Sequence, residues 1–167
     1  MNSIVVTKLD YCYAIYAGQP KKQLNRLQSL QNAAARLIYG AAKSCHITPH
    51  LQALHWLKIP ERITFKVGLL TFKVLRGSAP GYLMELVSPA TTTLRGQTLR
   101  SAESRRSCLD IPARKPRTVF GDRAFMVAAP MIWNAIPASL RELDLEGLFK
   151  RSLKTHLFVQ SYGQAPL

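Results

Sequence analysis

The clearest hydrophobic pattern along the chain lies in residues 21–39, KKQLNRLQSLQNAAARLIY. Apolar residues recur there at steps of three and four, which is the repeat of an amphipathic helix with one buried face. The residues of that face are Leu24, Leu27, Leu30, Ala34, Leu37 and Ile38. Gly40 follows, and glycine is the common residue just past a helix end. The pattern predicts a helix that ends at Gly40 and buries its leucines.

Further helices are predicted along the first half of the chain. Residues 3–17 form one candidate. The pair Thr48 and Pro49 provides an N-cap and a first-turn proline for a short helix through HLQALHWL. A longer helix is expected over 60–76, because its apolar residues again recur at helical steps. YLMELV, at 82–87, predicts another short helix.

The C-terminal part predicts one more helix and a second apolar strip. Asp144 is a suitable N-cap for a helix through LEGLFKRSLKTHLF. The face of this helix comprises Leu145, Leu148, Phe149, Ser152, Leu153, His156 and Leu157. The strip GDRAFMVAAPMIWNAIP, at 121–137, is expected to bury one side, with Pro130 kinking or splitting the helix. No convergent polar groups accompany Trp133, so core packing is favoured over a ligand pocket there.

Residues 88–118 have a different texture, rich in Ser, Thr, Gly, Pro and Arg with little periodicity, which is typical of a loop. Only SCLDIP, at 107–112, alternates enough to be a short strand. The predicted fold class is mainly α: a small helical domain with an irregular basic insert, which could include one short β-hairpin. The predicted segments are a helical thumb-like segment 1–87, the basic insert 88–118, a C-terminal helical segment 119–158 and a tail 159–167.

The charge balance indicates the class of partner. Lys and Arg number 23 against 9 Asp and Glu, which gives a net charge of +14. Such an excess favours polyanions, nucleic acid first and an acidic membrane surface second. The candidate nucleic-acid-binding residues are Arg95, Arg100, Arg105, Arg106, Arg114, Lys115, Arg117 and Arg123. Arginine suits bidentate phosphate contact, and no interleaved aromatic platform is present, so backbone contact without base reading is expected. The scattered lysines of the helices are interpreted as a solvated surface.

The same inventory offers little material for catalysis. The carboxylates are scattered, with no adjacent aspartates, whereas metal-dependent phosphoryl transfer needs clustered ones. No phosphate-binding glycine motif occurs. Cys45, His46, His50 and His55 lie close in sequence, but structural zinc sites use two close pairs of ligands, so a capped turn and helix is the favoured interpretation. No catalytic residue, metal ligand, cofactor or small-molecule substrate is therefore predicted.

Cysteine usage and hydropathy bear on location. The three cysteines are far apart and form no CxxC pair, which fits a reducing compartment. No apolar run approaches the ~20 residues of a membrane span. The expected location is intracellular, cytoplasmic or nuclear, with no membrane partner.

Three long segments carry a family resemblance. They are LDYCYAIYAGQPKKQLNRLQSLQNAAARLIYG, HITPHLQALHWLKIPERITFKVGLLTFKVLRGSAPGYL and FGDRAFMVAAPMIWNAIPASLR…LFKRSLKTHLF. In this order they resemble the C-terminal end of reverse transcriptases encoded by non-LTR (LINE-type) retrotransposons of the jockey/CR1/L2 kind. The resemblance runs from about Leu9 to about Phe158 and is weakest over 88–107. It implies the region after the polymerase palm, comprising the last part of the thumb and the segment beyond it.

The resemblance also limits the function. The family, RNA-directed DNA polymerases, carries a Tyr/Phe-Ala-Asp-Asp catalytic motif in the palm, and this sequence has no such motif. A non-catalytic fragment that binds RNA or DNA with low specificity is expected, with the missing polymerase core as a further partner. The alternative is an inactive structural remnant of a truncated element, whose apolar faces are orphaned interfaces.

Overall fold

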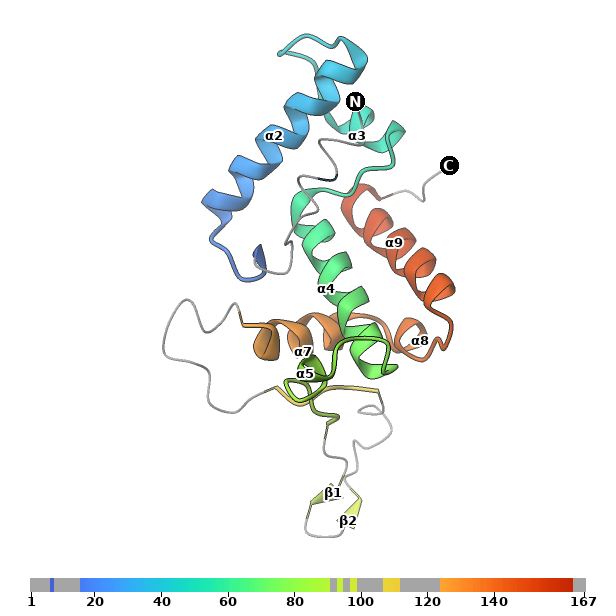
Figure 1. Ribbon diagram of the computed structural model, residues 1–167. Coiled ribbons are helices and arrows are strands. Elements are labelled where there is room, and N and C mark those ends of the chain that lie inside the picture. The colour runs from blue at the N-terminus through green and yellow to red at the C-terminus, as the bar shows by residue number, and fades with distance from the viewer. Residues whose placement is uncertain are drawn as a thin grey trace. The chain divides into compact units, whose positions relative to one another are not determined.

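The structure is a computed structural model that describes Thr7 and residues 16–90, 93–94, 97–98, 107–111 and 124–163 (Figure 1). Its described residues are mainly α, as predicted. The chain forms two compact units. Unit 1 comprises residues 1–66 and 151–167, and unit 2 comprises residues 67–150. The predicted helix over 3–17 lies largely outside the described residues.

Unit 1 begins with helix α2, Lys21–Tyr39, as the sequence pattern predicted. Pro20 precedes it with extended backbone, and Gly40 ends it in the left-handed conformation with φ of 58°. The Gly40 N–H donates to the carbonyl of Arg36, so the glycine closes the last turn.

The predicted buried face of α2 is covered only in part, since Leu24, Leu27 and Ala34 are half-buried and the other three residues are exposed. Leu30 is 60% exposed and Leu37 is 69% exposed, whereas Gln31 and Ala35 are buried. Polar contacts explain this choice: Gln31 Nε2 donates to Leu57 O at 2.9 Å, and Gln28 Oε1 accepts from Ile59 N–H at 2.9 Å. That second bond satisfies one of the backbone donors that the start of a helix leaves unpaired. The covered side of α2 is therefore the one that carries Gln28 and Gln31, which bond to the backbone of Leu57 and Ile59.

Helix α3, Thr48–Ala53, is shorter than predicted. Ile47 stands at the N-cap in place of Thr48, and no side chain caps the helix, although Pro49 lies in the first turn as expected. Leu51 is buried against Ala35 and Trp56. The three side chains form a small apolar core in unit 1.

Helices α4, Ile59–Leu75, and α9, Glu146–Tyr162, each contribute residues to both units. The α4 bounds agree with the prediction to within one residue at each end. Helix α9 begins two residues after Asp144. Phe149, Leu153 and Leu157 of its predicted face are buried, but Leu145 and Leu148 are exposed.

Unit 2 also contains short helices, a hairpin and a proline-bearing helix. Its further elements are α5 (Gly81–Met84), β1 (Thr93–Leu94), β2 (Gln97–Thr98), α7 (Phe125–Ala135) and α8 (Ala138–Arg141). The two strands pair antiparallel, Thr93 with Thr98 and Leu94 with Gln97, so the insert does include a short hairpin. Pro130 lies inside α7 without splitting it.

The strand predicted over 107–112 does not form a ladder within its described residues, 107–111. Within the described residues 107–111, Leu109 forms a single antiparallel bridge with Pro89. The bridge is flanked by two backbone bonds, from Ala90 N–H to Cys108 O and from Asp110 N–H to Ser88 O, so Pro89 occupies a position whose N–H this pairing does not need. Among the described helices, none combines the length and apolar character needed to cross a bilayer.

Candidate functional site

The predicted nucleic-acid-binding residues all fall outside the described part of the chain. They are Arg95, Arg100, Arg105, Arg106, Arg114, Lys115, Arg117 and Arg123. The structure therefore does not test whether these side chains lie together.

The described residues divide the charge unequally between the two units. In unit 1 the described Lys and Arg residues are Lys21, Lys22, Arg26, Arg36, Lys43, Lys58, Arg62, Lys66, Arg151 and Lys154. The acidic residue among the described residues of unit 1 is Glu61. In unit 2 the described cations are Lys73, Arg76, Arg141 and Lys150, and the described acids are Glu85, Asp110, Glu142, Asp144 and Glu146. The excess positive charge of the described chain is thus carried by unit 1.

The first turns of α2 present this charge to solvent. Lys21, Lys22 and Arg26 are exposed, and Lys22 and Arg26 are four residues apart, so they share one side of the helix. Lys43 is exposed on the segment that follows the helix. These cations can approach phosphate groups without losing a buried contact. From the sequence alone, the lysines among them are interpreted only as a solvated surface.

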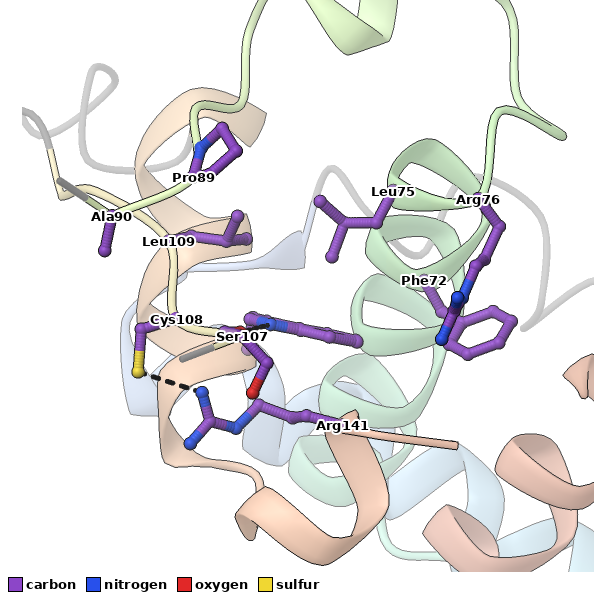
Figure 2. A pocket seen from close by; sticks show the side chains of 10 residues that line it. Phe72, Leu75, Arg76, Pro89, Ala90, Ser107, Cys108, Leu109 and Arg141 are labelled. Atoms are coloured by element: carbon purple, nitrogen blue, oxygen red, sulfur yellow. Dashed lines mark hydrogen bonds between the residues drawn. The ribbon is translucent and has the colours of Figure 1, made fainter. Parts of the chain in front are cut away.

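A cavity of about 470 Å³ lies within unit 2 (Figure 2). Its apolar lining comes from Phe72 and Leu75 of α4, from Pro89 and Leu109, and from Trp133. Trp133 is buried, so the prediction that it belongs to the core is confirmed, yet it also lines the cavity. Its ring lies 5.7 Å from that of Phe149.

Hydrogen bonds hold the segment 107–111 against helix α7 at this cavity. Trp133 Nε1 donates to Ser107 O at 2.6 Å, and Asn134 bonds to both backbone groups of Leu109. The opposite edge of the segment pairs with residues 88–90, because Ala90 N–H donates to Cys108 O and Asp110 N–H donates to Ser88 O. The cavity wall is therefore held by side-chain hydrogen bonds on one edge and by backbone pairing on the other.

Two arginines line the cavity, and their surroundings differ. Arg76 forms an ion pair with Asp144 at 2.6 Å and donates to Leu143 O, so its charge is compensated. Arg141 is only 8% exposed, and its Nη1 donates to Cys108 Sγ at 2.9 Å. The Nε of Arg141 is buried and has no hydrogen-bond partner, and no carboxylate of the described residues forms an ion pair with this side chain. Figure 2 shows the Arg141–Cys108 bond and, on α4, Leu75, Phe72 and Arg76.

Sequence reasoning missed Arg141. It follows ASL and precedes ELD, a polar context that is typical of an exposed helix end. Its burial depends on α8 being placed beside Cys108, which is distant in sequence. No local pattern signals that contact.

Two of the histidines considered as zinc ligands make ring contacts with aromatic side chains of unit 1. His50 stacks on Tyr39 with ring centroids 4.7 Å apart, and the His55 ring lies 6.3 Å from that of Phe158. Nowhere in the described ranges do three His, Cys, Asp or Glu side chains come together as a metal-binding group.

Tyr162 is the described residue with a shifted acidity. Burial, followed by the negative charge of Glu61, raises the pKa of Tyr162 to about 12. Its hydroxyl donates to Trp56 O at 2.8 Å, and Lys58 Nζ lies 4.9 Å from the centre of its ring. These contacts join α9 to the segment before α4 and are structural.

Comparison with protein-family models, with curated proteins and with solved structures finds no match to this chain. The candidate sites therefore rest on the chain's own residues. They are the exposed cations of unit 1 and the cavity at Arg141 in unit 2.

Proposed function

We propose that this chain is a non-catalytic C-terminal part of a LINE-type retrotransposon reverse transcriptase. It binds RNA or DNA through the phosphate backbone, with little preference for sequence. In the parent enzyme it would help to hold template RNA and primer DNA beside the polymerase core.

The uneven distribution of charge carries this proposal. The described part of unit 1 holds one acid, Glu61, among its many lysines and arginines. Most of its α2 cations are exposed, and those of the insert add to the same excess in the sequence. Phosphate contacts of this kind supply affinity that does not depend on base sequence.

The experiment is a titration of fluorescently labelled RNA and DNA of unrelated sequences with the full chain, at several salt concentrations. We expect similar affinities for the different sequences. The logarithm of the binding constant should fall linearly with the logarithm of the salt concentration, at a slope of roughly −0.7 to −0.9 per phosphate contact. Absence of binding at low salt would remove the proposal.

A second candidate function has its own support. Leu30 and Leu37 of α2 are exposed and lie seven residues apart, on one side of the helix, and neighbouring exposed leucines are typical of a surface that once had a partner. This favours an inactive remnant whose interface with the polymerase core has been lost. Light scattering and the nucleic-acid titration together separate the two candidates. The remnant is expected to self-associate in light scattering and to show no salt-dependent binding in the titration.

A further inference from the structure

The cavity of unit 2 contains a charge for which the described residues offer no counter-ion. Arginine stays protonated in proteins, so the guanidinium of Arg141 carries a full positive charge. It is 8% exposed, and within the described ranges its one hydrogen-bond acceptor is Cys108 Sγ, a weak acceptor. A buried charge of this kind is costly unless it is paired. The site is therefore incomplete in the described chain.

We propose that this cavity binds a small organic monoanion, with the anionic group at Arg141 and an apolar body along the remaining wall. The ligand class is a carboxylate carried on an aromatic or aliphatic group. This site is separate from the proposed phosphate contacts, and its existence does not depend on nucleic-acid binding.

A single negative charge on the ligand is expected because one of the two arginines at the cavity is already paired. Arg76 is compensated by Asp144, so among the described residues that line the cavity it is Arg141 that offers an unpaired cation to a ligand. One guanidinium matches one carboxylate, and the geometry of its N–H groups suits two parallel hydrogen bonds. A dianion such as a phosphate monoester would bring more charge than this site compensates.

The apolar body follows from the rest of the lining. Phe72, Leu75, Pro89, Leu109 and Trp133 surround the volume of about 470 Å³. Cavities of this size and lining are typical of small-molecule sites, in which apolar walls bury the ligand and a few polar groups orient it. A carboxylate without an apolar group would leave this wall in contact with water.

The probe is 4-phenylbutyrate, and its uncharged amide is the matched control ligand. Titration calorimetry with the full chain should show the acid binding at least roughly tenfold more tightly than the amide, because a charge-assisted hydrogen bond is lost with the amide. Phenyl phosphate is a third ligand and should bind more weakly than the acid. The position is checked by the emission of Trp133 in a Trp56→Phe background, since the chain has two tryptophans.

Two exposed leucines of unit 2 allow a matched pair of variants that leave Arg141 in place. Leu75 lines the cavity and is 39% exposed, whereas Leu148 is 48% exposed and is not part of the lining. Leu75→Glu brings a negative charge to the cavity and should weaken binding of the acid at least roughly tenfold. Leu148→Glu changes the net charge equally and should leave the affinity unchanged. Arg141→Gln should abolish the preference for the acid over the amide.

The results divide clearly. Three results would support the site: tighter binding of the acid than of the amide, a change in Trp133 emission, and loss of affinity in Leu75→Glu but not in Leu148→Glu. Equal affinity for acid and amide, equal effects of the two glutamate variants, or tighter binding of phenyl phosphate would overturn it. Absence of any binding by the wild-type chain would overturn it as well, even if the chain binds RNA.

Discussion

Asn134 forms two hydrogen bonds with the backbone of Leu109. Its Oδ1 accepts from the Leu109 N–H at 2.9 Å, and its Nδ2 donates to the Leu109 carbonyl at 2.8 Å. A side-chain amide thereby takes the place of a neighbouring strand, which would exchange the same two bonds. Because Leu109 is 3% exposed, water offers no easy substitute.

We predict that Asn134→Ala destabilises the protein by about 2–4 kcal/mol. The substitution leaves two backbone groups of Leu109 without partners, and each buried unpaired group costs roughly 1–3 kcal/mol, partly offset by the higher helix propensity of alanine. Urea unfolding followed by circular dichroism measures the change. The control is Asn25→Ala on α2, where the side chain is exposed and a change within about 0.5 kcal/mol is expected. Equal effects of the two variants would contradict the role of Asn134.

On α2, we expect the polar residue to matter more than its apolar neighbour. Gln31→Ala removes the bond to Leu57 O at a buried position and should cost about 1–3 kcal/mol. Leu30→Asp changes a side chain that is 60% exposed and should cost less than about 1 kcal/mol. Thermal unfolding of the two variants ranks them, and a larger loss for Leu30→Asp would mean that the leucine face is the buried one.

The raised pKa of Tyr162 predicts that the protein loses stability at alkaline pH. Burial and the charge of Glu61 raise its pKa in the folded protein to about 12, above the ordinary value of 10.0. The folded state therefore favours the protonated phenol, and its contribution is fully present below pH 10 and is lost as the pH rises from 10 towards 12. Urea unfolding of the wild type and of Tyr162→Phe should show a difference that changes over this range, because phenylalanine does not titrate. A difference that stays constant across it would exclude Tyr162 as the cause.

The nucleic-acid proposal predicts that the insert cations contribute to binding. Changing Arg105, Arg106, Arg114 and Arg117 together to Ala should weaken binding about equally for unrelated sequences and should flatten the salt dependence, since fewer counterions are released. Labelled-oligonucleotide titration at several salt concentrations measures both effects. Unchanged affinity and slope would remove the insert from the binding surface.

A matched pair of single variants separates the two units. Lys22 of unit 1 and Lys150 of unit 2 are both exposed lysines, so Lys22→Gln and Lys150→Gln alter the net charge equally. We expect Lys22→Gln to weaken RNA binding more, because Lys22 lies among the cations of α2. Lys150 belongs to the unit whose described residues hold five acids against four bases. The same titration ranks the two, and equal effects would mean that only net charge matters.

The sequence by itself determined the helical segments and several of their ends. Steps of three and four residues marked α2, α4 and α9, and Gly40 marked an end correctly, since these signals depend on neighbours along the chain. Net charge was also fixed without any structure. Burial of Trp133 followed from the size and apolar context of the side chain.

Tertiary structure decided which face of each helix is covered. A helical repeat shows that leucines share a side of α2, but the backbone of residues 57–59 pairs with Gln28 and Gln31 on another side, and that partner lies far along the chain. The same holds for Arg141, whose contact with Cys108 spans a large sequence separation. Local periodicity carries no information about such contacts, because burial is a property of whatever the fold brings alongside a residue.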